Sequence, residues 1–192
     1  TQTGVTDAKG NTATYAYNSL NDRLNSVTSA NSTVSYTYDN VGVLNNITSP
    51  SGTVYNFAYD RFGNRTDVSI GERILSINTY DTTRGLLMNT YYGNVHVLYY
   101  DYDILDRLIK KTYNGTVIVN YKYDKFGNLY EKQDTLYNVN YRYSYDLSGR
   151  ITGVTGSNNT SVNYVYDNYN RVEKFIAKTP YNTNSTEYVY GS

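Results

Sequence analysis

The sequence has no cysteine and no tryptophan, and it contains only one histidine, one methionine and two prolines. Without cysteine, neither disulfides nor thiolate metal sites can stabilise the fold. The 17 basic and 17 acidic residues cancel, so charge gives no reason to expect a nucleic acid or an anionic membrane as partner. Because no run of 18 apolar residues is present, no membrane insertion is expected.

Tyrosine supplies the apolar area that the missing residue types cannot. There are 26 tyrosines, and threonine, serine, asparagine and glycine fill much of the remainder. This composition favours strands and turns over helices. The length of 192 residues is sufficient for one domain with a sizeable core.

An aromatic-x-Tyr-Asp pattern repeats along the whole chain. Its second aromatic residue recurs every 21 to 24 residues, at Tyr17, Tyr38, Tyr59, Tyr80, Tyr102, Tyr123, Tyr145, Tyr166 and Tyr190. This regularity predicts a single repeat array over residues 1–192, without a second domain or a linker. Since residue 1 falls inside a repeat, we expect the chain to be a fragment of a larger polypeptide.

Each repeat is predicted to form a β-hairpin. Residues 33–38 alternate between small polar side chains and valine or tyrosine, which is typical of a strand. Residues 39–42 form a turn, a second strand follows, and residues 49–52 return the chain to the next repeat. We therefore predict an all-β fold of tandem antiparallel hairpins, about 21 residues each, with roughly 16–18 strands in total. Accumulated twist should make the sheet curved or spiralling.

The first turn of each repeat has a recognisable chemistry. An aspartate suits its opening position, and the residue three positions later must often adopt positive φ, which Gly, Asn and Asp tolerate. The occupants of this later position are Asn21, Gly42, Gly63, Arg84, Asp106, Gly127, Gly149 and Asn170. Arg84 does not fit, and the turn is expected to shift to Gly85. The structural turn residues are predicted to be Asp39, Gly42, Asp60, Gly63, Asp124, Gly127, Asp146, Gly149, Asp167 and Asn170.

The second strand shows apolar residues three positions apart, as in Leu24 and Val27 or Leu44 and Ile47. Strict alternation would place the two members of each pair on opposite faces. Either a β-bulge or burial of both faces could explain this spacing.

The repeated tyrosines have two possible roles. They could form a structural seam of cross-strand aromatic pairs, or a platform on which glycans stack. Their fixed place in each repeat favours the seam, which is predicted to comprise Tyr17, Tyr38, Tyr59, Tyr80, Tyr102, Tyr123, Tyr145 and Tyr166.

No enzyme active site is expected, and no catalytic, cofactor-binding or metal-binding residue is predicted. The repeated aspartates are explained by turn formation, and no calcium-binding loop pattern is present. The one histidine, His96, lies in a predicted strand and has no second metal-ligating or catalytic partner nearby in the sequence.

The repeat resembles the tyrosine-aspartate repeats, known as YD or RHS repeats, of bacterial polymorphic toxins, insecticidal toxin complexes, wall-associated proteins and teneurins. The best copies of the signature are YSYDLSGRI at residues 143–151 and YKYDKFGNL at residues 121–129. The resemblance covers essentially the whole chain.

The resemblance implies an antiparallel sheet that spirals into a hollow shell around a C-terminal effector. In that family an Asp-Pro-x-Gly core with an aspartate protease function follows the repeats. Neither Pro50 nor Pro180 follows an aspartate here, so this segment can supply only the wall.

These observations lead to one principal functional hypothesis and two alternatives. The first is a non-catalytic section of a shell that encapsulates or displays the parent's own C-terminal cargo or core domain. The second is a glycan- or cell-surface-binding adhesion module, and the third is end-to-end self-association through open sheet edges. Secretion or a cell-surface location is implied by the resemblance alone.

Overall fold

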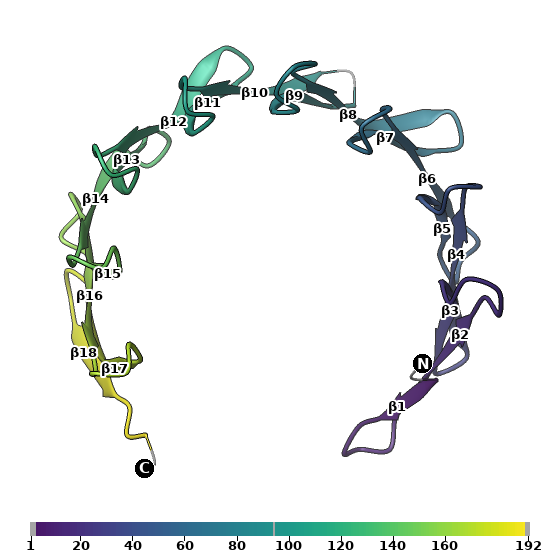
Figure 1. The fold of residues 1–192 in the computed structure, drawn as a ribbon, viewed down its shortest axis with the longest axis horizontal. Helices are drawn as coiled ribbons and strands as arrows, with labels where there is room; N and C mark the ends of the chain where they lie inside the picture. The colour runs from purple at the N-terminus through teal and green to yellow at the C-terminus, as the bar shows by residue number, and fades with distance from the viewer. Residues whose placement is uncertain (1–2, 94, 191–192) are drawn as a thin grey trace. The chain divides into compact units, whose positions relative to one another are not determined.

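The computed structural model describes residues 3–93 and 95–190, and its strands are labelled in Figure 1. These residues form 18 antiparallel strands and no helix, which confirms the predicted all-β fold. They belong to two compact units, residues 1–97 and residues 98–192, and each unit is described by itself.

The first unit is a meander in which each strand pairs with the next along the chain. Its strands are β1 (Gly4–Thr6), β2 (Thr12–Tyr17), β3 (Leu24–Ser29), β4 (Ser32–Tyr38), β5 (Leu44–Thr48), β6 (Val54–Tyr59), β7 (Arg65–Ile70), β8 (Arg73–Tyr80) and β9 (Leu87–Tyr92).

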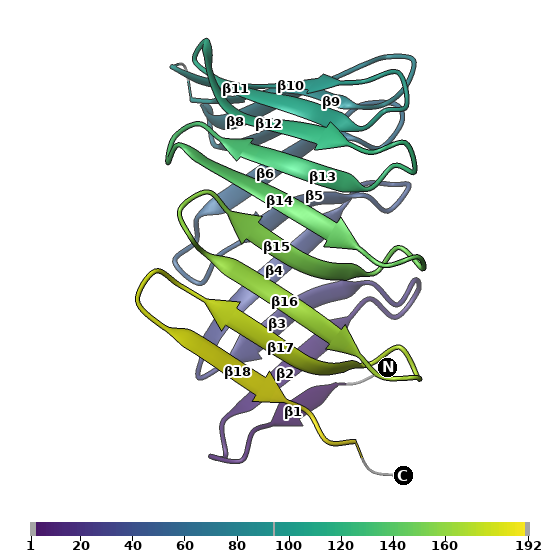
Figure 2. The same cartoon turned by 90° about the vertical axis from the view of Figure 1, so that its left-hand side faces the viewer.

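The second unit repeats this arrangement, and Figure 2 shows β11–β18 following one another in chain order. Its strands are β10 (His96–Tyr102, paired from Leu98 onward), β11 (Leu108–Tyr113), β12 (Thr116–Tyr123), β13 (Leu129–Asp134), β14 (Val139–Tyr145), β15 (Ile151–Gly156), β16 (Ser161–Tyr166), β17 (Val172–Lys178) and β18 (Thr183–Glu187). In the described part of the chain, no helix is long and apolar enough to cross a membrane.

Successive turns lie on alternate edges of each meander, because consecutive strands are antiparallel. The turns that follow a repeated tyrosine therefore share one edge within a unit. These "aspartate turns" open at Asn18, Asp39, Asp60, Asp81, Asp103, Asp124, Asp146 and Asp167, and the edge that they form is here called the aspartate edge.

Positive φ angles mark the end of every aspartate turn. They occur at Asp22, Gly42, Gly63, Gly85, Asp106, Gly127, Gly149 and Asn170. The assignment of Asn21 was therefore wrong. The first turn contains one extra residue, so that the N–H of Asp22 donates to the Asn18 carbonyl at 3.0 Å. The turn at Asp81 is also longer, and the expected shift to Gly85 is observed.

A β-bulge follows each aspartate turn and explains the three-residue apolar spacing. Tyr17 pairs with Leu24 and Tyr15 pairs with Val27, while the register shifts by one residue between these pairs. Since Tyr15 and Tyr17 share one face of their strand, Leu24 and Val27 also share it. The same shift accompanies Tyr38, Tyr59, Tyr80, Tyr102, Tyr123, Tyr145 and Tyr166.

The bulges give each unit two different faces. One face carries the repeated tyrosines and the aliphatic residues opposite them, and it is here called the aromatic face. The other carries mainly threonine, serine, asparagine and charged residues, as in the pairs Ser26–Ser35 and Asn46–Asn56, and it is here called the polar face.

Neither unit contains an enclosed core, contrary to the expectation from chain length. Among the described residues, only Val139, Thr90 and Gly153 are buried, and the exposed fractions of Val139 and Thr90 are 6% and 5%. The repeated tyrosines are only half-buried. Each unit is a single layer of sheet, so its stability must come from cross-strand pairs, turns and hydrogen bonds more than from a core.

Candidate functional site

The aspartate edge is rich in polar contacts, and seven of its eight turns are closed by one carboxylate, the exception being the turn that opens at Asn18. In the turn at Asp146, Oδ1 accepts the backbone N–H groups of Ser148 and Arg150, both at 2.9 Å. Backbone bonds close the same turn from Gly149 to Asp146 and from Asp146 to Arg150, at 3.0 and 2.9 Å. One side chain thereby organises the whole turn.

The second carboxylate oxygen binds the side chain of the residue that ends the turn. In three turns this residue is an arginine, whose Nε lies 2.6 to 2.8 Å from Oδ2: Arg107 with Asp103, Arg150 with Asp146, and Arg171 with Asp167. In two others it is an asparagine: Asn64 with Asp60 at 3.0 Å, and Asn128 with Asp124 at 3.1 Å.

These contacts hold the turn aspartates in their charged form. The pKa of the Asp146 carboxyl is lowered, chiefly because the backbone N–H of Arg150 donates to it. The pKa is also lowered at Asp39, Asp60, Asp81, Asp103, Asp124 and Asp167. A carboxylate stabilised in this way is a poor general base, and the geometry indicates a structural role.

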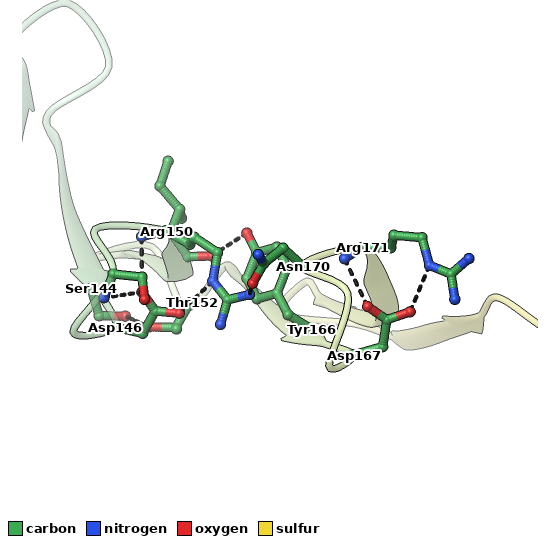
Figure 3. Close-up of polar contacts among 10 residues, drawn as sticks. Ser144, Asp146, Arg150, Thr152, Tyr166, Asp167, Asn170 and Arg171 are labelled. Carbon is green, nitrogen blue, oxygen red and sulfur yellow. Dashed lines mark hydrogen bonds and ion pairs between the residues drawn. The ribbon is translucent and has the colours of Figure 1, made fainter. Parts of the chain in front are cut away.

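The arginines also reach the next repeat. Arg150 lies over the ring of Tyr166, with 4.4 Å to the ring centroid, and donates to Oδ1 of Asn170 at 2.5 Å (Figure 3). Arg107 covers Tyr123 at 4.6 Å, and Arg171 covers Tyr190 at 4.0 Å. Each arginine therefore joins its own turn to the following repeat by an ion pair and a cation–π contact.

Six of the repeated tyrosines make a second connection between repeats. The hydroxyl of each donates to a backbone carbonyl on the strand before it, for example from Tyr145 to Leu129 at 2.8 Å. The β13–β14 ladder begins only at Glu131 and Arg142, so Leu129 lies beyond its end. The hydroxyl thus binds a carbonyl that no ladder bond reaches.

This hydroxyl bond recurs in both units. The other pairs are Tyr38 with Leu24, Tyr80 with Arg65, Tyr123 with Leu108, Tyr166 with Ile151 and Tyr190 with Val172, at 2.7 to 3.0 Å. The accepting residue is always the one paired opposite the preceding repeated tyrosine, as Leu129 is paired with Tyr123. In the second unit these contacts form an unbroken series from Tyr102 to Tyr190.

The sequence analysis did not predict the connections between repeats that the structure shows. The signal was present in the residue that ends each turn, which is often Arg or Asn and lies four positions after the aspartate. It also missed the turn at Asp7, whose side chain binds Asn11 in the same way on the opposite edge. The Asp-x-x-Gly-Asn spacing there matches residues 60–64 and 124–128.

Within residues 3–93 and 95–190, no three histidine, cysteine, aspartate or glutamate side chains are grouped so that they could hold a metal ion. His96 begins β10 and belongs to no such group.

A single-layer array of tyrosine-aspartate hairpins is the architecture of a shell-forming repeat. The chain belongs to the Teneurin YD-shell family, whose sequence model matches residues 2–143. The resemblance seen in the sequence is thereby confirmed. A search of curated proteins finds no match.

Solved structures of toxin complexes share the fold. A crystal structure of TcdB2-TccC3-Cdc42 matches 95% of this chain with a TM-score of 0.67 and 18% identity. TcdB2-TccC3 matches 95% with a TM-score of 0.67 and 17% identity, and the Photorhabdus luminescens Tc holotoxin pore matches 92% with 0.66 and 18%. This chain spans only 11%, 12% and 11% of those chains, respectively.

The hydroxyl bond generates a prediction for β14. Tyr145→Phe should lower the free energy of unfolding by about 1 kcal/mol, because the half-buried Leu129 carbonyl loses its partner. Tyr143→Phe is the matched control, since Tyr143 shares the strand and face but its hydroxyl makes no such bond in the described structure. Urea unfolding measures both variants, and equal losses would contradict a special role for Tyr145.

A second prediction concerns the space that the arginines need. A Cβ added at Gly42 would lie 1.5 Å from the Arg23 guanidinium, whereas one at Gly149 would meet nothing within 4 Å. Both glycines have positive φ, so alanine is strained at either position. Gly42→Ala should therefore lower the melting temperature more than Gly149→Ala, because it also displaces Arg23 from Tyr38. In an Arg23→Ala background the difference should vanish, and a persisting difference would refute this explanation.

Proposed function

We propose that this chain is a section of the wall of a hollow β-shell in a larger parent protein, and that the shell encloses or displays the parent's own C-terminal effector. The proposal assigns the chain no catalytic role. It also places the parent protein outside the cell or on its surface, as its family membership and the toxin-complex neighbours suggest.

The observation that carries the proposal is the absence of an enclosed core in a well-bonded sheet. Each unit is one layer thick, with half-exposed side chains on both faces. In an independently folded domain, one face of a sheet is usually buried against another layer of the same domain. The wall of a shell instead exposes both faces of its sheet, one to each of the two compartments that it separates.

The exposed tips of the aspartate turns support a position within a larger assembly. Several of these turns carry large apolar side chains in solvent: Leu20, Val41, Phe62, Leu105, Phe126, Leu147 and Tyr169 are 62 to 109% exposed. Rows of this kind are typical of surfaces that another part of an assembly covers. The small share of the toxin-complex chains that this chain spans, 11 to 12%, agrees with that position.

The proposal also treats the seam tyrosines Tyr17, Tyr38, Tyr59, Tyr80, Tyr102, Tyr123, Tyr145 and Tyr166 as structural. The half-buried rings of all eight support this role, and so do the hydroxyl bonds that five of them make to neighbouring strands, namely Tyr38, Tyr80, Tyr123, Tyr145 and Tyr166. A glycan platform would need rings and hydroxyls that are free to contact a ligand.

Single cysteines can test the wall because the natural sequence has none. Lys132 and Gln133 are neighbours on β13 that face opposite sides, since they pair with Tyr121 and Asn120 on the aromatic and polar faces. In the isolated chain, Lys132→Cys and Gln133→Cys should both react with a bulky polymer maleimide. In the intact parent protein only one of them should react, because the other faces the enclosed space.

Opening the parent's shell by partial proteolysis should restore labelling at the protected position. A small maleimide that penetrates the shell serves as the control for a folded and reactive thiol. Equal labelling of both cysteines in the intact parent would contradict the wall, and would favour an adhesion module with both faces in solvent.

A further inference from the structure

The residue that ends an aspartate turn decides whether the next tyrosine ring is covered. Where it is arginine, the guanidinium lies over the following ring, at 4.0 to 4.6 Å for Arg107, Arg150 and Arg171 and at 5.8 Å for Arg23. Where it is asparagine, the side chain binds its own aspartate but is too short to reach the next repeat. The rings that follow the asparagine turns are Tyr80 and Tyr145.

A cavity is present at both asparagine positions. In the second unit it has a volume of about 610 Å³ and is lined by Asp124, Phe126, Asn128, Tyr145, Leu147 and Gly149, among others. In the first unit a cavity of about 510 Å³ is lined by Asp60, Phe62 and Tyr80, among others. The recurrence of the same lining types indicates one kind of niche in two repeats.

The space around the turn glycines also differs between repeats that follow an arginine turn and repeats that follow an asparagine turn. A Cβ at Gly127 would lie 3.9 Å from the guanidinium of Arg107, which ends the preceding turn. A Cβ at Gly149, which follows the asparagine turn at Asp124, would meet nothing within 4 Å. The space that an arginine of the chain fills in one repeat is therefore open in the next.

We propose that the niche between the turns at Asp124 and Asp146 binds the guanidinium group of an arginine from a polypeptide lying along the aspartate edge. The bound group would take the place that Arg150 takes between Asp146 and Tyr166. The Asp124 carboxylate and the Tyr145 ring are the corresponding partners. This inference stands on the geometry of the repeats and does not require the shell role.

The charge and shape of the niche both match this occupant. The pKa of the Asp124 carboxyl is lowered, which favours its charged form. The residue that closes its turn is the neutral Asn128, whereas Asp146 is already paired with Arg150 at 2.6 Å. Among the described residues, no cation lies over the Tyr145 ring, and the ammonium of Lys125 lies over Phe126 instead. A guanidinium is planar, can stack on the ring and can bind the carboxylate at the same time, which an ammonium cannot do as well.

The first-unit cavity is the weaker site. Arg61 lies over Phe62 at 4.6 Å and is itself one of the residues that line this cavity, whereas Lys125 does not line the cavity of the second unit. The pKa of Asp60 is lowered chiefly by the hydrogen bond from the Asn64 side chain, and the charge of Arg61 lowers it further. A cation of the chain therefore already occupies part of that niche. The test is accordingly made on Tyr145.

The probe is N-acetyl-arginine amide, titrated into the whole chain with isotope-labelled tyrosine rings and followed by NMR. The Tyr145 signals are expected to shift with a dissociation constant on the order of ten millimolar, because exposed ion pairs and cation–π contacts are individually weak. N-acetyl-lysine amide, the matched control, should produce smaller shifts at the same concentration.

Two substitutions test the niches in opposite directions, since one fills the niche at Tyr145 and the other opens an equivalent niche at Tyr166. Asn128→Arg should cover Tyr145 with the chain's own guanidinium and abolish its response to the probe, without lowering the melting temperature. Arg150→Asn should uncover Tyr166 and give it a response that the natural chain lacks.

The proposal is overturned if the Tyr145 signals do not move in the natural chain, or if they move equally in Asn128→Arg. It is also overturned if the lysine and arginine probes act alike, since simple charge attraction would then be sufficient. The two variants fill and empty equivalent niches, so a failure of one to fold leaves the other as a test.

Discussion

At six places along this protein, a bond between a tyrosine hydroxyl and a backbone carbonyl of the preceding hairpin extends the junction between repeats beyond the end of the backbone ladder. At the aspartate edge the ladder between neighbouring hairpins stops before the strands end, as it does at Glu131 and Arg142. Carbonyls beyond that point need another donor, and the tyrosine supplies it. In a sheet without an enclosed core, such bonds contribute a larger share of the stability than they would in a globular domain.

This constraint explains which positions of the repeat vary. The second aromatic position is tyrosine in all nine repeats, although phenylalanine would pack equally well there. The first aromatic position is less restricted and contains Phe57 and Asn78. Asn78 is the informative exception, because its amide donates to the same Arg65 carbonyl that Tyr80 binds. All six hydroxyl bonds to a neighbouring strand come from the second position.

Much of the fold could be predicted from the sequence because its determinants are local. Alternation defines the strands, and backbone sterics define the turns, including the shift from Arg84 to Gly85. The prediction was wrong at Asn21, because turn length depends on backbone bonds that close at Asp22 and not on residue preference alone. The bulges remained unresolved because the spacing of Leu24 and Val27 fits either a bulge or two buried faces. The hydroxyl bonds and the reach of the arginines could not be predicted, since each partner lies in another repeat at a distance that only the assembled sheet defines.

The central claim is that each hydroxyl bond joins one hairpin to the next, and native-state hydrogen exchange tests it most directly. In Tyr145→Phe, the backbone amides at the open end of the β13–β14 ladder, near Glu131 and Arg142, should exchange faster than in the natural chain. Amides of β16 and β17, which lie beyond the affected junction, should keep their rates. Local acceleration confined to this junction is the predicted result; unchanged exchange at Glu131 and Arg142, or a uniform acceleration across all strands, would contradict the account.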